Sequence, residues 1–439
     1  MWLFDVLRPA PRAANVPEAA IADIYRHRRV QLFVAVYLGY ALYYVVRKNI
    51  TVALPPLMAE LGLTKLQMGI ILSLFDATYA FSKIVNGPLC DRTNPRYFMA
   101  IGLLGTALAN FCFGFSSIPV LFGLWWILNG FFQSMGSPVG PKAIASWFST
   151  RERGRFYGVW NTCHNLGAAL SVVVSGMVVQ YFGWRYGFFV PGTIAFLGAG
   201  FVAWRMLDRP ESVGLPPIQE YHGELPKGTV YDTQETAWQL FRNYVLTNHR
   251  IWLLAVASML IYMVRNGIAN WGVTFLSEAR NYSLAHSGFT ASFFEWMGIP
   301  GTLIAGFLAD RFFPRRNLVV AAMYLVCLVF AVLGIWLVPR GSPVLDACAF
   351  GLCGFLVYGA QMICTGIGPL SMVPRRAAAS AVALTGALSY VGSVITSTLS
   401  GHLTDALGWH ATFAFWAVCG FLAVLVISPL VFSRRGSLT

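Results

Sequence analysis

The 439-residue chain is too apolar to be a soluble protein, because 57% of its residues are hydrophobic and only 11% are charged, against about 25% charged in globular domains. Its formal net charge of +13 would suit a nucleic-acid-binding protein. The basic residues, however, alternate from loop to loop instead of forming one patch, so we expect a lipid bilayer and no nucleic acid as partner.

Twelve segments are long and apolar enough to cross a bilayer as helices. In chain order they lie near 30–50, 68–90, 97–117, 120–147, 156–180, 186–207, 251–276, 287–310, 317–338, 344–370, 377–403 and 411–432. Several of the connections are short, so adjacent helices must run antiparallel. The sequence therefore predicts an all-α membrane protein with twelve transmembrane helices in two six-helix bundles.

A polar segment rich in Pro, Glu, Gln and Lys separates the two sets of six. Arg and Lys gather in this segment, near both ends of the chain and in every second loop, which by the positive-inside rule makes both termini cytoplasmic. The predicted organisation is a cytoplasmic N-terminal tail (1–29), an N-terminal bundle (30–207), a cytoplasmic linker (208–250), a C-terminal bundle (251–432) and a cytoplasmic C-terminal tail (433–439).

Two repeats relate the halves. Tyr44-Val-Val-Arg47 returns as Tyr262-Met-Val-Arg265, 218 residues later. A longer pattern, G-x-x-x-D-R-x-x-x-R, occurs twice with an offset of 219 residues, at Gly87, Asp91, Arg92 and Arg96 and again at Gly306, Asp310, Arg311 and Arg315. Nearly equal offsets indicate a duplication and thus pseudo-symmetric bundles. We expect this second pattern to act in conformational change, through small-residue contacts and helix-end charges.

Positive charge is in excess inside the apolar segments. An Arg at the centre of a membrane helix costs about 2.5–3.5 kcal/mol, yet one lies in each half, at Arg47 and Arg265. The other intramembrane charges are Lys48, Lys83, Lys142, Asp76 and Glu295. The surplus of cations favours a mobile anion as the missing partner. Two Arg forks suit a phosphate dianion, because guanidinium binds such oxygens bidentately.

Polar side chains follow the same helices. Tyr40, Tyr44 and Arg47 are spaced i, i+4 and i+7, which places them on one helical face. Asn161 and His164 lie one turn apart, and Tyr262 precedes Arg265 by three positions. Purely structural roles stay open for three of these residues. His164 could be a packing group, Lys142 a side chain that reaches the membrane interface, and Glu295 a structural partner of a neighbouring cation.

The paired G-x-x-x-D-R-x-x-x-R pattern resembles the major facilitator superfamily over the whole chain. Within it, Tyr43-Tyr-Val-Val-Arg-Lys-Asn49, Trp160-Asn-Thr-Cys-His-Asn165 and Glu295-Trp-Met-Gly-Ile-Pro-Gly-Thr302 resemble the organophosphate:phosphate antiporter family. The resemblance implies a phosphate-binding pair and a pocket around it. These residues are Arg47 and Arg265, assisted by Lys83 and His164 and lined by Tyr40, Tyr44, Asn161, Tyr262, Tyr358 and Tyr390.

The function that the resemblance implies is exchange of an organic phosphate, hexose-6-phosphate or glycerol-3-phosphate, for inorganic phosphate in a bacterial inner membrane. A monomer suffices for this fold. The alternative is a receptor that senses external sugar phosphate with the same pocket and signals to a kinase. No Walker loop, HExxH or nucleophile elbow is present, so we expect no enzyme. The eight cysteines show no metal-ligand spacing, and neither a metal nor a cofactor is expected.

Overall fold

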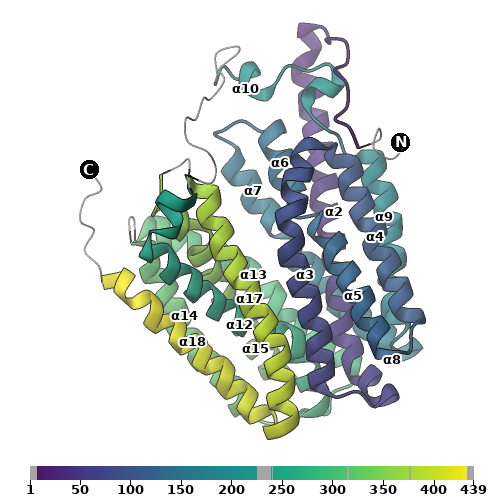
Figure 1. Ribbon diagram of the computed structural model, residues 1–439, viewed down its shortest axis with the longest axis vertical. Helices are drawn as coiled ribbons and strands as arrows, with labels where there is room; N and C mark the ends of the chain where they lie inside the picture. The colour runs from purple at the N-terminus through teal and green to yellow at the C-terminus, as the bar shows by residue number, and fades with distance from the viewer. Residues whose placement is uncertain (1–6, 225–238, 240, 314–315, 375–376, 433–439) are drawn as a thin grey trace. The chain divides into compact units, whose positions relative to one another are not determined.

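The computed structural model describes residues 7–224, 239, 241–313, 316–374 and 377–432, and these residues form helices and no β-strand (Figure 1). Eleven helices in this part of the chain are long and apolar enough to cross a membrane.

The helices of the first half are α2 (Glu18–Leu61), α3 (Lys65–Arg92), α4 (Pro95–Phe115), α5 (Pro119–Ser134), α6 (Val139–Trp147), α7 (Arg153–Asn161), α8 (Cys163–Phe182) and α9 (Tyr186–Arg205). Two short turns, η1 (Pro210–Val213) and α10 (Ile218–Tyr221), follow α9. The second half contains η2 (Arg242–Leu246), α12 (His249–Glu278), α13 (Leu284–Arg311), α14 (Asn317–Leu337), α15 (Pro343–Gln361), η3 (Met362–Ile367), α16 (Gly368–Leu370), α17 (Ala378–Leu407) and α18 (Trp409–Phe432).

Most predicted helix ends lie within a few residues of the observed ones, and four segments differ. The segment 156–180 is divided at Thr162 into α7 and α8. The helix expected at 30–50 extends in both directions to form α2, which contains Pro55 and Pro56. The segment 120–147 is interrupted between α5 and α6, where Gly136-Ser-Pro138 interrupts the helical hydrogen bonding. The segment 344–370 contains the π-helical turn η3.

The chain divides into two compact units. Unit 1 comprises 1–50 and 78–232, and unit 2 comprises 51–77 and 233–439. The division falls within α2 and within α3, so the helical hairpin 51–77 groups with the second half of the chain, although the sequence analysis assigns it to the N-terminal bundle.

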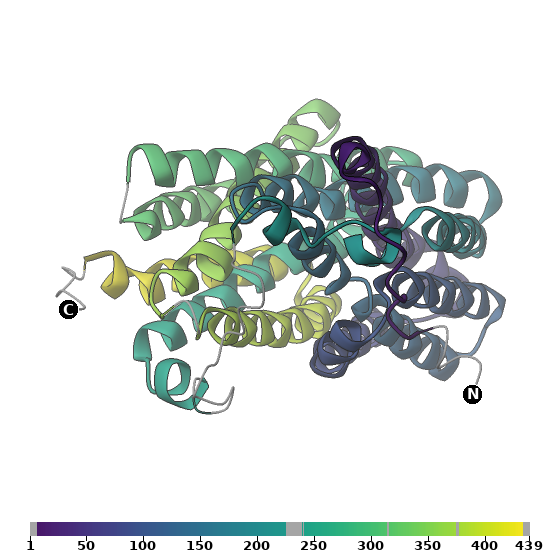
Figure 2. The ribbon, with the colours of Figure 1, turned by 90° about the horizontal axis from the view of Figure 1, so that it is seen from above.

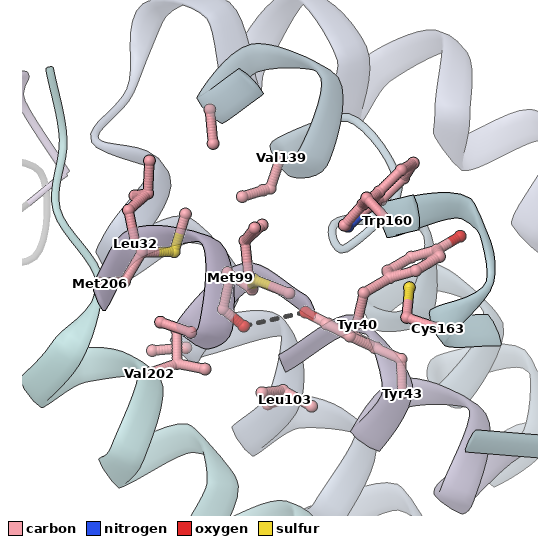
Figure 3. Close-up of a cluster of buried hydrophobic side chains, with 14 of the residues drawn as sticks. Leu32, Tyr40, Tyr43, Met99, Leu103, Val139, Trp160, Cys163, Val202 and Met206 are labelled. Atoms are coloured by element: carbon pink, nitrogen blue, oxygen red, sulfur yellow. Dashed lines mark hydrogen bonds between the residues drawn. The ribbon is translucent and has the colours of Figure 1, made fainter. Parts of the chain in front are cut away.

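The core of unit 1 forms where α2 packs among neighbouring helices of the same unit. Figure 3 shows Leu32, Tyr43, Met99 and Val202 in this cluster, and all four are fully buried. The phenol of Tyr43 donates a hydrogen bond of 2.9 Å to the backbone oxygen of Met99. A buried Tyr hydroxyl needs such a partner, and this bond fixes the rotation of α2 against α4.

The N-terminal segment pairs with the chain that leaves α9. The amide of Ala13 donates to the carbonyl of Glu211 (3.0 Å) and that of Val16 to Gly214 (3.1 Å). The amide of Ala10 donates to the carboxylate of Asp208 (2.8 Å). Figure 2 shows this purple segment running beside the teal η1. These bonds form a clasp, which we define as residues 10–16 with 208–214.

Lys142, whose role the sequence leaves open, caps the end of α3. Its ammonium donates to the backbone oxygens of Cys90 (2.6 Å), Thr93 (2.7 Å) and Asp91 (3.3 Å). The last carbonyls of a helix have no partner within the helix, and a cation there also interacts favourably with the helix dipole. Lys142 is thus a structural residue in unit 1.

In unit 2, α13 and α15 cross closely. A Cβ atom added at Gly301 would lie 2.1 Å from the carbonyl oxygen of Phe355, and one added at Gly354 would lie 1.9 Å from that of Phe294. Any side chain at either position would push the backbones apart. This pair of glycines sets the register in which residues of α13 meet residues of α15.

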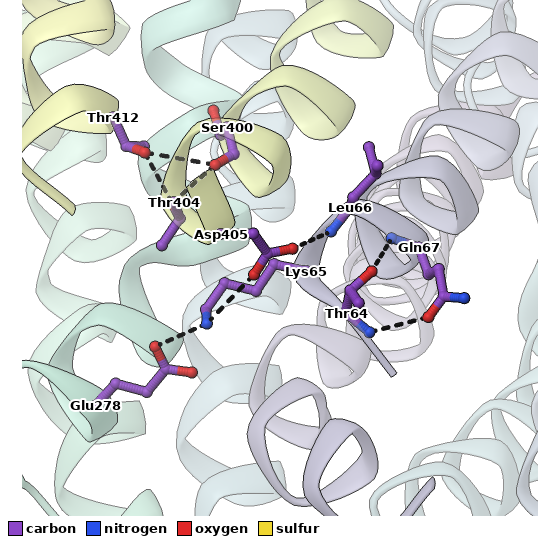
Figure 4. Close-up of polar contacts among 9 residues, drawn as sticks. All are labelled: Thr64, Lys65, Leu66, Gln67, Glu278, Ser400, Thr404, Asp405 and Thr412. Atoms are coloured by element: carbon purple, nitrogen blue, oxygen red, sulfur yellow. Dashed lines mark hydrogen bonds and ion pairs between the residues drawn. The ribbon is translucent and has the colours of Figure 1, made fainter. Parts of the chain in front are cut away.

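The hairpin 51–77 is bound to the rest of unit 2 by polar contacts (Figure 4). The ammonium of Lys65 lies 3.2 Å from a carboxylate oxygen of Glu278 and 3.7 Å from one of Asp405. The amide of Leu66 donates to Asp405 (2.9 Å). These contacts tie the start of α3 to the ends of α12 and α17.

A buried ion pair lies at the start of α15. Asp346 is fully buried, and its carboxylate lies 3.3 Å from Nε of Arg280, whose side chain is only 7% exposed. Tyr282 donates a hydrogen bond of 2.8 Å to the same carboxylate. Burial and this bond raise the pKa of Tyr282 to about 12, so Tyr282 remains a donor throughout the physiological pH range.

Candidate functional site

In unit 1, Arg47 lies against two aromatic faces. Its guanidinium carbon is 4.9 Å from the ring centre of Tyr79 and 5.4 Å from that of Tyr44. The ammonium of Lys83 approaches the same Tyr79 ring at 5.5 Å. Cations at such distances are attracted by the ring quadrupole. Tyr79 of α3 therefore brings the side chains of Arg47 and Lys83 to one place.

The predicted stripe on α2 continues this group. The rings of Tyr40 and Tyr44 are 5.6 Å apart, and His164 of α8 approaches Tyr44 with ring centres 5.4 Å apart. The ring centres of Trp160 of α7 and Tyr40 are 5.0 Å apart. The structure thus brings Tyr40, Tyr44, Arg47, Lys83 and His164 together. Asn161, at the end of α7, is half-buried, and within the described residues no hydrogen bond or ring contact joins it to them.

In unit 2, Arg265 belongs to a hydrogen-bonded chain. Its Nη2 donates to the hydroxyl of Tyr358 (3.1 Å), which donates in turn to a carboxylate oxygen of Glu295 (2.5 Å). All three side chains are buried, with 7%, 2% and 4% exposure respectively. Buried charges are stable only when they are paired and hydrogen-bonded. Glu295 therefore supports Arg265 through Tyr358, which gives it the structural partnership that the sequence left open.

Two further tyrosines complete the group in unit 2. The guanidinium of Arg265 lies 4.5 Å from the ring centre of Tyr358 and 5.2 Å from that of Tyr262. The rings of Tyr262 and Tyr390 are 6.0 Å apart. Gln361 donates to the hydroxyl of Tyr262 (3.3 Å). The substrate-binding residues predicted for the second half, namely Arg265, Tyr262, Tyr358 and Tyr390, are thus in one cluster.

Asp76 takes part in a different polar group of unit 2. Its carboxylate accepts a hydrogen bond from Ser393 of α17, whose oxygen accepts another from Asn266 of α12 (2.6 Å). Ser73, one turn before Asp76 on α3, contacts Thr398 (2.6 Å). Asp76 is 4% exposed. One role of this acid is therefore to join the hairpin 51–77 to α12 and α17.

The duplicated conformational pattern is mostly exposed. Asp91, Arg92, Asp310 and Arg311 are exposed at the ends of α3 and α13, and among the described residues none of them forms an ion pair. A Cβ added at Gly87 would meet nothing within 4 Å, whereas one at Gly306 would lie 3.1 Å from the methyl of Met362. Arg315 lies outside the described residues. The expected role in conformational change stays a prediction.

One residue of this pattern has a defined contact. Nε of Arg96 donates to the backbone oxygen of Ala203, and its guanidinium lies 5.1 Å from the ring of Tyr97. Arg96 therefore ties the start of α4 to α9 within unit 1.

Four residues of these clusters are not among the predicted site residues: Tyr79, Trp160, Glu295 and Gln361. Tyr79 had a usable signal, because it precedes Lys83 by four positions on one helical face. The others are polar or aromatic residues whose neighbours come from other helices. Within the described residues no group of three or more His, Cys, Asp or Glu side chains could hold a metal ion.

The chain matches the family model of the Major Facilitator Superfamily over residues 36–395. This match, together with the membrane-length helices, confirms the predicted fold class, an all-α membrane protein of the major facilitator fold. It also confirms that the chain is a multi-pass membrane protein and not an enzyme.

Similar proteins identify the family within this superfamily to which the chain belongs. The chain is 38% identical to a probable hexose phosphate transport protein of Chlamydia pneumoniae, over 92% of this chain and 91% of that protein. It is 34% identical to the glycerol-3-phosphate transporter of Bacillus subtilis, over 97% of both chains. It is also 35% identical to the membrane sensor protein UhpC of Salmonella typhimurium, over 93% of this chain and 92% of that protein. Similarity of this extent, carried along nearly the full length, shows that the chain belongs to the organophosphate:phosphate antiporter family of the major facilitator superfamily.

Proposed function

We propose that the protein exchanges an organic phosphate ester, hexose-6-phosphate or glycerol-3-phosphate, for inorganic phosphate across a bacterial inner membrane, with both termini in the cytoplasm. The observation that carries the proposal is the repeated arginine. In each unit an Arg of a membrane helix stands at the same place in a duplicated phrase and lies against tyrosine rings. The relatives named above include transporters of both classes of ester.

In this proposal Arg47 and Arg265 bind the oxygens of one phosphate group. A phosphate monoester carries nearly two negative charges at neutral pH and accepts bidentate bonds from guanidinium. Lys83 adds positive charge, and the tyrosines Tyr40, Tyr44, Tyr262, Tyr358 and Tyr390 offer hydroxyls and apolar ring faces to the organic part. His164 and Asn161 complete the pocket.

Exchange follows from electrostatics. Without an anion, two guanidinium groups would repel as the halves close around the site, and a bound dianion would remove that repulsion. The loaded protein can then alternate between its two openings, whereas the empty protein resists the change. Either phosphate species permits the return step, so uptake of the ester is coupled to release of inorganic phosphate. A monomer contains both units and suffices.

The experiment is counterflow in liposomes that hold the purified protein and are loaded with inorganic phosphate. We expect uptake of labelled phosphate that requires internal phosphate and that hexose-6-phosphate or glycerol-3-phosphate inhibits, while the unphosphorylated sugar does not. Absence of exchange by folded protein, or exchange unaffected by both esters, would contradict the proposal.

Two variants test the forked donors. Arg47→Lys and Arg265→Lys keep the charge and lose the bidentate geometry. Since a hydrogen bond to a charged group contributes about 1.5–3 kcal/mol, each should lower exchange about 10- to 100-fold. Arg340→Lys, in the exposed loop before α15, is the control and should exchange like the wild type. Wild-type exchange by Arg265→Lys would refute the role of this residue.

The similarity to a membrane sensor favours one second candidate, a receptor that binds external sugar phosphate in the same pocket and signals to a kinase. The two functions differ in one measurement. A receptor binds hexose-6-phosphate, detectable by calorimetry on the purified protein, yet catalyses no counterflow in liposomes. Binding together with exchange identifies the transporter.

A further inference from the structure

Unit 1 contains a groove that is separate from the candidate site. It is a cavity of about 750 Å³ between the basic end of α2 and the last turns of α9. Its lining residues are Arg26, His27, Val30, Gln31, Val34, Phe201 and Arg205. Gln31 donates to the backbone oxygen of Arg205 (2.7 Å), which joins the two helices beside the groove.

One end of the groove is cationic. Arg26 is exposed and Arg205 is half-buried, with its guanidinium carbon 5.0 Å from the ring of the exposed Trp204. Within the described residues neither Arg forms an ion pair with a carboxylate. Asp23 lies one turn before Arg26 on α2 but does not line the groove. Two cations are therefore available at this end to an anion from outside the protein.

The other end is apolar and opens outward. Val30 and Val34 are 62% and 44% exposed, and Leu197, one turn of α9 before Phe201, is 66% exposed. Val30 and Val34 lie in the apolar run expected near 30–50 and Leu197 in the one near 186–207, so we expect their exposed faces to meet hydrocarbon. On both helices the sequence changes from uncharged to basic at this level, as expected where a helix leaves the bilayer core.

A second cavity on the neighbouring face of α2 offers a contrast. It shares Arg26, Val30 and Val34 with the groove. Its other arginine, Arg29, is already bound to Glu152 with 2.7 Å between nitrogen and oxygen. That cavity therefore has less free positive charge, and an anion is expected on the α9 side of α2.

We infer that the groove between α2 and α9 binds an anionic phospholipid. Its headgroup phosphate contacts Arg26 and Arg205, and an acyl chain lies along Val30, Val34 and Phe201. The apolar wall distinguishes this ligand from a soluble phosphate, which would gain nothing from it. Each cation near an anionic membrane lipid contributes about fivefold in affinity, so the two together contribute about 25-fold. This inference does not depend on the proposed transport activity.

The test uses the full-length protein in a neutral detergent with phosphatidylglycerol that carries a photoactivatable group in its acyl chain. After irradiation, mass spectrometry should place adducts on peptides that contain Val30, Val34 or Phe201. Phosphatidylcholine with the same chain should label these peptides about 25-fold less at equal concentration. Equal labelling by both lipids, or adducts elsewhere only, would overturn the inference.

Variants distinguish binding in the groove from a general attraction of the anionic lipid to positive charge on the protein. Arg26→Gln/Arg205→Gln should lose the preference for phosphatidylglycerol, whereas Arg26→Lys/Arg205→Lys should retain most of it. Arg151→Gln/Arg155→Gln removes the same charge at exposed positions outside the groove and should label like the wild type. An equal loss in this control would overturn the inference, as would displacement of the lipid by millimolar glycerol phosphate, which would show that the apolar wall contributes nothing.

Discussion

The two units surround their corresponding arginines, Arg47 and Arg265, with different side chains. In unit 1, Arg47 lies over the rings of Tyr44 and Tyr79, next to a second cation, Lys83. In unit 2, Arg265 is joined through the hydroxyl of Tyr358 to Glu295, so a carboxylate balances its charge. After a duplication, the arginines have therefore kept their positions while their surroundings diverged.

The difference extends to the ion pairs at the edges of the units. Unit 2 encloses Asp346 and Arg280 almost completely, whereas the pair Arg29 and Glu152 of unit 1 remains accessible, with side chains 19% and 37% exposed. Water screens the accessible pair and not the enclosed one. The enclosed pair of unit 2 should thus contribute more to stability than the accessible pair of unit 1, and the following predictions test this contrast from the largest effect to the smallest.

Asp346→Asn should be the most damaging change to stability. It keeps the shape of the side chain but leaves Arg280 buried without its counter-charge, which costs about 3–5 kcal/mol. Unfolding of the purified protein in detergent measures this loss. Asp405→Asn is the matched control, because Asp405 is partly exposed and 3.7 Å from Lys65, and it should cost less than about 1 kcal/mol. Equal losses would show that enclosure does not matter.

Tyr358→Phe should lower the exchange rate about tenfold, since it removes the hydroxyl between Arg265 and Glu295 while the ring under the guanidinium remains. Tyr262→Phe is the comparison within the same unit. Its ring also lies under Arg265, but its hydroxyl accepts only from Gln361 among the hydrogen bonds described above, and we expect a change below about threefold. Similar rates for the two variants would break the asserted link to Glu295.

Lys83→Gln should act on affinity and leave the maximal rate largely intact. Lys83 is exposed and contributes positive charge near Arg47, with its ammonium 5.5 Å from the ring centre of Tyr79. We expect the KM for phosphate to rise about fivefold, an effect that high salt should reduce. A fall in maximal rate with unchanged KM would assign Lys83 a positioning role and weaken the contrast between the units.

Glu152→Gln should give the smallest effect, less than about 1 kcal/mol. Partial burial raises the pKa of Glu152, but hydrogen bonds from Arg29 and Ser149 outweigh burial and hold that pKa below its ordinary value of 4.5. The contribution to stability is therefore present above pH 4.5 and is lost as pH falls through the lowered pKa. The unfolding temperatures of wild type and variant should converge in acid; a constant gap would contradict this.

The membrane helices could be predicted because each is a long apolar run whose length the bilayer dictates. The break at residues 135–138 cannot be predicted in this way, since the apolar pattern continues across it and only Gly136 and Pro138 indicate an interruption. The full length of α2 cannot be predicted for the opposite reason. Its first turns are polar and continue the helix outside the apolar run.

The candidate site was predictable within a helix and not between helices. The spacing of Tyr40, Tyr44 and Arg47 is fixed by helical geometry, and these residues do cluster. The bond from Tyr358 to Glu295 depends on how α13 crosses α15, which Gly301 and Gly354 set by their close approach. No pattern along one segment contains that crossing. Asp76 illustrates the same limit, because its partner Ser393 lies more than 300 residues away.

The clasp between residues 10–16 and 208–214 has a practical consequence. Backbone amides near the N-terminus donate hydrogen bonds to the chain that follows α9. A truncated protein beginning at α2 would therefore leave the carbonyls of Glu211 and Gly214 and the carboxylate of Asp208 without these donors. An expression strategy that trims the first seventeen residues as dispensable would therefore loosen the exit of the connecting segment, and affinity handles are better added without removing them.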